Sequence, residues 1–231
     1  MNRDAVTFVC SFALAASAAC AGVDSVLTFD NLPNPPALDQ RLPLSEANGG
    51  GSVIEGVTFD SRFQLHGRDV RISNDPTNPL FGRPHSGDFY LSNGQHAESV
   101  GLSNDAMILT TDRVLLSLWA GQNEYYGFGG GADQLTITAF GGNGNLGAIV
   151  LDLPDNAPGD SEVLGFFDTS AFTAFRGQIE GYRINRRMLG SDNGNYILDT
   201  LTFEIPAPGA VSAFGAMIAC SRGTRRRRHA A

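Results

Sequence analysis

Short apolar segments separated by turns run through the middle of this 231-residue chain. Residues 26–30 and 134–140 alternate apolar and polar side chains, which is typical of a β-strand that buries one face, and residues 197–205 are expected to form the last strand. Clusters of Gly, Pro, Asn and Asp stand between such segments, and the chain holds 28 glycines and 11 prolines. No segment longer than about ten residues repeats with the period of a helix. The sequence therefore predicts an all-β fold.

About ten strands are expected, at the spacing of a sandwich. The clearest hairpin joins residues 134–140 to residues 146–153 through a turn rich in Gly and Asn. One strand is expected over 53–60, an irregular crossing over the proline-rich 32–43, and a short helical or irregular turn over 166–175. The remaining expected strands cover 63–72, 88–92, 106–109, 113–120 and 179–185. Because each alternating strand needs an apolar partner layer, we expect a two-sheet, jelly-roll-like β-sandwich.

The first 21 residues have the layout of a secretory signal peptide. A short charged head precedes an apolar run, and small residues follow up to Ala19-Cys20-Ala21, which indicates export with cleavage after Ala21. A buried N-terminal helix is the alternative interpretation. Lipidation of Cys20 is less favoured, because the large aliphatic residue expected three positions before such a cysteine is missing.

Charge is distributed unevenly along the chain, which contains no lysine. Setting aside Arg3, Asp4, Arg222 and residues 225–228 leaves 23 of the 24 acidic residues and 10 of the 16 arginines, a formal charge of −13. Such a body repels phosphate backbones, so nucleic acid is not an expected partner. The three cysteines lie at positions 10, 20 and 220. The body therefore has no disulfide, cysteine metal site or cysteine nucleophile.

The C-terminal segment 205–231 combines a Pro-x-Pro motif, an uncharged run rich in Ala and Gly, and an arginine cluster. The motif and the cluster consist of Pro206, Pro208, Arg225, Arg226, Arg227 and Arg228. As a helix, residues 205–221 would rise about 25 Å, the lower end of what spans a bilayer core. Arginines beyond it would be held on the cytoplasmic side, which predicts transient anchoring in the inner membrane during export. A disordered basic tail that binds nucleic acid or anionic lipid is the alternative.

This tail resembles the PEP-CTERM sorting signal of bacterial exported proteins, with Ala207 in place of the family's central glutamate. The body also resembles the β-sandwich often found upstream of that signal, in residues 26–33, 135–147, 179–184 and 198–203. The resemblance implies processing by an exosortase-type enzyme and delivery to the cell surface or the extracellular space, in a biofilm or polysaccharide setting. The expected division is a signal peptide at 1–21, a β-sandwich domain at 22–204, and a sorting signal with an apolar helix at 205–231.

Asp30 and Asp199 are candidate calcium ligands. In jelly-roll carbohydrate-binding modules, carboxylates of the first and last strands often lie side by side, and these two residues occupy such places, with Asp24 and Asn31 near the first. Calcium prefers hard oxygen ligands of this kind. The alternative is that both are solvent-facing strand residues next to turns, where Asp is common. The histidines at 66, 85 and 96 show no zinc-ligand spacing, so a three-histidine site requires that the fold gather them.

An aromatic cluster around the Gly-rich loop 122–131 is a candidate glycan site. It comprises Trp119, Tyr125, Tyr126 and Phe128, whose rings would stack on sugars beside Asn, Gln and Glu side chains. In the alternative interpretation, Trp119 ends a core strand and the tyrosines pack at the edge of the sandwich.

No sequence pattern indicates a catalytic centre. The carboxylates that a glycosidase would need are present at Asp88, Glu98, Glu124, Asp133 and Glu180, but no spacing selects a pair. The chain also has no G-x-S-x-G motif of a serine hydrolase. We therefore expect a non-catalytic protein that binds extracellular polysaccharide or has a structural role in the cell envelope or biofilm matrix. An extracellular glycan-active hydrolase is the alternative.

Overall fold

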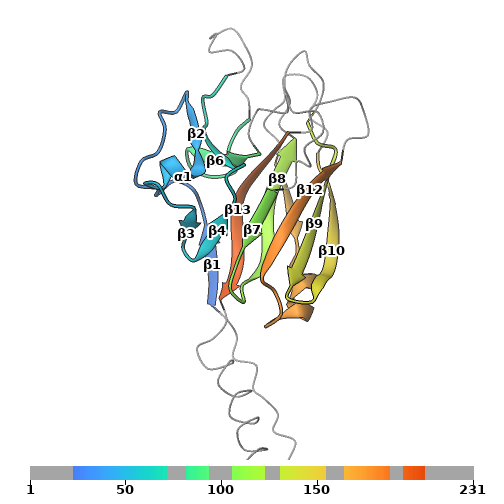
Figure 1. The fold of residues 1–231 in the computed structure, drawn as a ribbon. Coiled ribbons are helices and arrows are strands. Elements are labelled where there is room, and N and C mark those ends of the chain that lie inside the picture. The colour runs from blue at the N-terminus through green and yellow to red at the C-terminus, as the bar shows by residue number, and fades with distance from the viewer. Residues whose placement is uncertain are drawn as a thin grey trace, which may run out of the picture.

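A computed structural model of the protein describes residues 23–71, 82–93, 106–122, 131–154, 164–187 and 195–205. These residues form two antiparallel sheets of seven and six strands (Figure 1). The sheets enclose one large cluster of buried side chains. The prediction of an all-β, two-sheet sandwich is confirmed.

The seven-stranded sheet has the order β11-β8-β13-β6-β5-β2, and β1 pairs with β13. Its strands are β1 (Val23–Leu27), β2 (Arg41–Pro43), β5 (Gln64–Gly67), β6 (Phe89–Ser92), β8 (Val114–Gln122), β11 (Gly165–Asp168) and β13 (Tyr196–Ile205). The first and last described strands are antiparallel partners, with Val23 opposite Ile205 and Leu27 opposite Leu201. This pairing confirms the expectation that the two ends of the sandwich meet.

The six-stranded sheet has the order β10-β9-β12-β7-β4-β3. Its strands are β3 (Val53–Ile54), β4 (Val57–Phe59), β7 (Ala106–Leu109), β9 (Gln134–Gly141), β10 (Gly144–Asp152) and β12 (Gly181–Arg187). The expected hairpin is present as β9 and β10, which pair along their whole length. Two short helical elements complete the described fold: α1 (Leu44–Ala47) and the 3-10 helix η1 (Ser170–Phe175).

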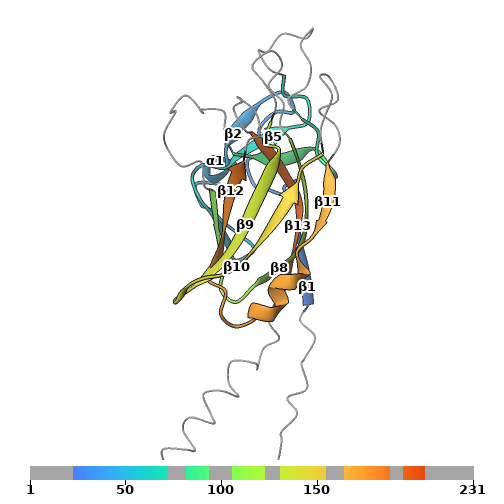
Figure 2. The ribbon, with the colours of Figure 1, turned by 90° about the vertical axis from the view of Figure 1, so that its right-hand side faces the viewer.

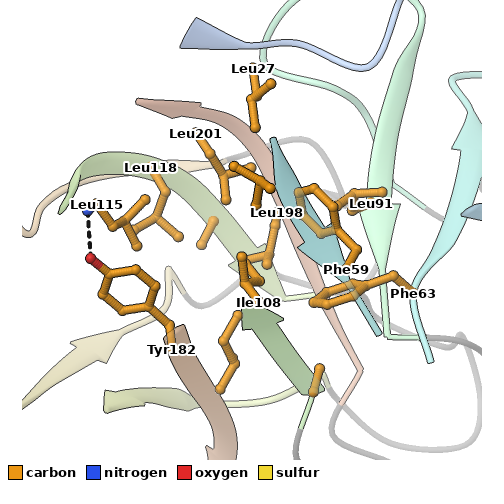
Figure 3. Packing of buried hydrophobic residues seen from close by; sticks show 14 of the residues in the cluster. Leu27, Phe59, Phe63, Leu91, Ile108, Leu115, Leu118, Tyr182, Leu198 and Leu201 are labelled. Carbon is orange, nitrogen blue, oxygen red and sulfur yellow. Dashed lines mark hydrogen bonds between the residues drawn. The ribbon is translucent and has the colours of Figure 1, made fainter. Parts of the chain in front are cut away.

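The core lies between the sheets and is built from alternate residues of their strands (Figure 3). Leu118 and Leu198 reach it from the seven-stranded sheet, and Ile108 reaches it from the six-stranded sheet. The hydroxyl of Tyr182 crosses the layer to the opposite sheet, where it accepts a hydrogen bond from the Leu115 N–H at 2.7 Å. A buried hydroxyl needs such a partner, so this bond fixes how β12 and β8 face each other.

Several expected elements differ in the structure. The segment 53–60 is a hairpin instead of one strand, because Glu55 and Gly56 both adopt positive φ (47° and 78°) and form its turn. The first strand lies three residues earlier than expected, so Asp30 follows β1 in a turn. The segment 166–175 begins in β11 before it enters η1, and the expected crossing at 32–43 ends in β2.

The expected terminal signals, residues 1–21 and the Pro-x-Pro, apolar and arginine segments after residue 205, lie outside the described residues. Within the described ranges, no helix has the length and apolar character needed to cross a bilayer.

Candidate functional site

A bulge in β13 places Asp199 on the outer face of the seven-stranded sheet. Asp199 pairs with Trp119 and Thr202 pairs with Ser117, so three steps along β13 match two steps along β8. The extra residue is Thr200, whose φ is 46°. An added residue of this kind turns the following side chains to the other face, which is why Leu198 and Leu201 both reach the core although they are three positions apart.

The Asp199 carboxylate, which is fully buried, holds the backbone of a distant segment. Its Oδ2 accepts hydrogen bonds from the His85 N–H at 2.6 Å and from the Ser86 N–H at 3.1 Å. Its Oδ1 accepts the Thr200 N–H at 2.6 Å. Burial raises the pKa of this carboxyl above its ordinary range, against the opposing effect of the N–H donors of Ser86, Thr200 and His85. The group is thus a desolvated acceptor whose contacts are directed at the backbone.

Asp30 binds the same segment two residues further on. Its Oδ1 accepts the Asp88 N–H at 2.7 Å. Gly87 has a φ of 69°, and a Cβ at this position would collide with the Asp30 carboxylate. Only glycine therefore fits here. We call residues 85–88 the clamped segment, because Asp30 and Asp199 hold its two halves against the sheet.

The two expected calcium ligands are therefore brought to one segment, but both carboxylates accept hydrogen bonds from backbone N–H groups there. N–H donors and a cation compete for the same carboxylate oxygens. In the part of the chain that the structure describes, no group of three or more His, Cys, Asp or Glu residues is placed to hold a metal ion. Calcium binding by Asp30 and Asp199 stays a prediction.

Three rings lie next to one another on this face of the sheet, and we call them the aromatic row: His85, Trp119 and Phe166. The His85 and Trp119 rings are stacked, with centroids 3.6 Å apart and planes at 14°. Phe166 meets Trp119 edge-on at 5.6 Å, since the two residues are paired across β11 and β8. Phe166 is 57% exposed, so the row ends in an accessible apolar ring.

The base of the aromatic row is a small second hydrophobic cluster. Trp119 packs there against Tyr90, Leu164 and Ile197, separately from the main core. Trp119 therefore lies inside β8 and faces outward, where the sequence allowed either a glycan site or the end of a core strand. Tyr125 and Tyr126, its expected partners, lie outside the described residues.

The histidines do not form a common site among the described residues. His66 is fully buried in β5, and its ring centroid lies 5.3 Å from that of Tyr90. Burial, with the charge of Arg41, lowers the pKa of His66 to about 3, so the imidazole is neutral at physiological pH. His85 belongs to the aromatic row, and His96 lies outside the described residues.

The candidate hydrolase carboxylates are also dispersed. Asp88 borders the seven-stranded sheet and pairs with Arg68 at 2.6 Å. Asp133 and Glu180 precede β9 and β12, which are antiparallel neighbours, so they stand at opposite ends of these strands. Glu98 and Glu124 lie outside the described residues. The three described carboxylates therefore form no acid pair across one groove.

The sequence does not indicate the clamped segment as a unit or Phe166, although His85 and Asp88 were each considered for other sites. The segment reads His-Ser-Gly-Asp, which indicates a turn but not the carboxylates that hold it. Phe166 belongs to a segment for which the sequence indicates only a short helical or irregular turn, and its outward direction depends on its pairing with Trp119. Both features arise from contacts between segments that are far apart in the sequence.

No protein-family model and no curated protein match this sequence. Two solved structures are similar to it. One is a DUF4465 family protein from Bacteroides caccae, with 14% identity, a TM-score of 0.47, and coverage of 79% of this chain and 100% of that chain. The other is the K2 cleaved adhesin domain of Lys-gingipain, with 12% identity, a TM-score of 0.39, and the same coverage of both chains. Likenesses this distant concern the fold, and no function follows from them.

Proposed function

We propose that this protein is an exported, non-catalytic protein that binds extracellular glycan through the aromatic row on its seven-stranded sheet. The observation that carries the proposal is the exposed Phe166 ring beside a tryptophan whose position is fixed by its neighbours. Sugar rings have apolar faces that stack on aromatic side chains, and nearby polar groups fix their orientation. A row of rings on a sheet suits an extended chain of sugars.

Contacts within the protein position the aromatic row before any ligand binds. Pairing between β8 and β11 sets Trp119 and Phe166, while Asp199 sets the backbone that carries His85. A site that is already ordered loses little conformational entropy on binding. Since His85 covers one face of the Trp119 indole, the ring surfaces offered to a glycan are those of His85 and Phe166.

Two hydroxyls beside the row supply polar contacts. Ser86 Oγ and Thr200 Oγ1 lie 3.0 Å apart, and His85 Nδ1 lies 3.4 Å from Thr200 Oγ1. Each hydroxyl can donate one hydrogen bond and accept others. They are therefore suited to exchange hydrogen bonds with the hydroxyls of a sugar.

The cellular setting follows from the two terminal signals. In this proposal a signal peptide at 1–21 directs export, and a jelly-roll-like sandwich at 22–204 binds the ligand. The sorting signal at 205–231 anchors the chain transiently in the inner membrane until an exosortase-type enzyme processes it, so the protein functions at the cell surface or in the extracellular matrix. The intact mass of protein recovered from the cell surface tests this step: loss of about residues 209–231 supports it, and a complete C-terminus refutes it.

Binding can be measured through Trp119, because it is the only tryptophan of the chain. Titration with candidate bacterial polysaccharides is expected to shift its emission. Phe166→Ser should weaken binding at least tenfold. Val150→Ser is the matched control: Val150 is also 57% exposed, but it lies on the other sheet. Equal binding by the parent and Phe166→Ser would refute this use of the row, and release of reducing ends during the titration would identify a hydrolase instead.

A further inference from the structure

A second row of outward side chains lies beside the aromatic row, and we call it the polar row: Thr202, Ser117 and Asp168. Ser117 is paired with Asp168 of β11 and with Thr202 of β13. Successive residues of a strand face opposite ways, and Phe167 packs against the core, so Phe166 and Asp168 both face outward. The two rows are therefore about 7 Å apart, which is two residues of strand.

Phe166 and Asp168 stand at the margin of the seven-stranded sheet, on its last strand β11 (Figure 2). Both side chains are exposed. A ligand can therefore lie against the aromatic ring and the carboxylate at the same time. When a sugar ring stacks on Phe166, a substituent on the edge of that sugar comes within reach of the Asp168 carboxylate.

The Asp168 carboxylate is ionised and has acceptor positions left for a ligand. Its Oδ1 accepts the Ser170 N–H at 2.8 Å. This hydrogen bond, together with one from the Ser170 side chain, lowers the pKa of Asp168 below its ordinary value, so the group keeps its negative charge at neutral pH. No arginine in the described part of the chain forms an ion pair with it. Since a carboxylate has about four acceptor positions, most of them stay available.

The other described charges near this face do not neutralise Asp168. Asp24 lies opposite Glu204 across β1 and β13, and Arg176 donates to Glu204 at 2.7 Å, which leaves the charge of Asp24 uncompensated. Arg83 precedes the clamped segment, which β13 holds, and is not beside β11. The body of the chain has a formal charge of −13 once the terminal charges are set aside. Such a field attracts cationic ligands and repels anionic ones.

We propose that the aromatic and polar rows together select glycans with free amino groups, with Phe166 stacking on a sugar ring and Asp168 binding its protonated amine. This inference rests on the proposed glycan binding and adds the class of glycan. An ammonium group only donates and an ionised carboxylate only accepts, and opposite charges strengthen the hydrogen bond between them. A sugar carboxylate in the same place would lie within the screening length of about 8–10 Å from Asp168 and would be repelled. The hydroxyls of Ser117 and Thr202 can exchange further hydrogen bonds with the sugars.

Three sugar hexamers of the same linkage test the proposal: those of glucose, N-acetylglucosamine and glucosamine. They differ in one substituent of each ring, which is a hydroxyl, an uncharged amide or an amine. At mildly acidic pH, where the amine is protonated, the purified protein is titrated with each hexamer and Trp119 emission is followed. The glucosamine hexamer should bind most tightly, and added salt should remove its advantage over the other two.

Asp168→Asn removes the charge but can keep the local fold, because the amide oxygen of asparagine can still accept the Ser170 N–H. The change should weaken binding of the glucosamine hexamer about twofold to fivefold, the range of one solvent-exposed ion pair. Binding of the glucose hexamer should stay unchanged. Asp152→Asn is the matched control, since it removes one exposed carboxylate from the six-stranded sheet. It should leave all three affinities unchanged.

The outcomes separate this inference from the proposed function. Equal binding of the three hexamers by the parent overturns the inference and leaves glycan binding intact. An equal loss of affinity in Asp168→Asn and Asp152→Asn also overturns it, since the attraction would then come from the net charge. A parent that binds none of the hexamers overturns it as well, while the titration with bacterial polysaccharides and Phe166→Ser still decides the proposed function. Urea unfolding midpoints show whether each variant is folded.

Discussion

Replacing Asp199 by Ala tests whether this carboxylate positions the aromatic row. The change removes the acceptor of three backbone N–H groups, those of His85, Ser86 and Thr200. A buried donor left without a partner costs about 1–3 kcal/mol, and the lower value applies where water can enter beside the partly exposed segment. Removing a desolvated carboxylate offsets part of this cost. We expect a net loss of about 2 kcal/mol in the free energy of unfolding.

The effect should also be local, and Trp119 reports it. Without the Asp199 contacts, His85 is no longer held over the indole, so Trp119 emission should shift to longer wavelength and acrylamide should quench it more. Asp60→Ala is the matched control. Asp60 accepts hydrogen bonds from the backbone N–H groups of Arg62 and Met107. Its loss should therefore destabilise the protein, but next to β7 of the six-stranded sheet and not beside the aromatic row. It should leave Trp119 emission in the folded state unchanged.

Urea unfolding at neutral pH separates the two expectations, because it gives the free energy from the midpoint and the local environment from the folded baseline. The reasoning is refuted if Asp199→Ala unfolds at the parent's midpoint with the parent's folded emission. It is also refuted if Asp60→Ala shifts the folded emission as strongly, since the change would then reflect general loosening.

Three further outcomes are expected. Burial raises the pKa of Asp199, so the folded protein keeps the carboxyl proton at pH values where the unfolded chain has lost it. The unfolding free energy of the parent, relative to that of Asp199→Asn, should therefore fall as the pH rises from about 4 through the raised pKa. An increase over this range would contradict the expected sign. Glu55→Asn should stabilise the β3–β4 hairpin by about 0.5–1 kcal/mol in thermal unfolding, because asparagine tolerates the positive φ of residue 55. A variant that is no more stable than the parent would show that the exposed Ser25–Glu55 hydrogen bond outweighs the backbone strain. If Asp30 and Asp199 bind calcium, the ion should raise the melting temperature and EDTA should lower it; no change in either, with no heat of binding, removes the site.

The sandwich could be predicted because its strongest signals are local. The hairpin of β9 and β10 follows from two alternating segments and the glycine-rich turn between them. The hairpin of β3 and β4 was missed for a local reason as well: Glu55 occupies a turn position where Asn or Gly is the usual signal, so the segment resembles one continuous strand.

The candidate site could be predicted only in part, since its geometry depends on strand register. Trp119 was singled out as an aromatic residue, but its partners His85 and Phe166 are separated from it by 34 and 47 positions. Asp30 and Asp199 were expected to meet because the first and last strands pair. The two carboxylates hold the turn at Gly87 between them. This turn could not be predicted from Asp30 or Asp199, because the direction of Asp199 depends on the bulge at Thr200.

The position of β13 also determines how the domain transmits force. β13 lies inside its sheet, with β8 on one side and β6 and β1 on the other. A pull on Ile205, with the protein held by its aromatic row, would load these ladders in shear, so that many hydrogen bonds must break together. A pull between Val23 and Ile205 would instead peel β1 from β13 one pair at a time, because these residues are direct partners. The same sandwich therefore resists a load applied through the sheet face that carries the aromatic row and yields readily to one applied between its two ends.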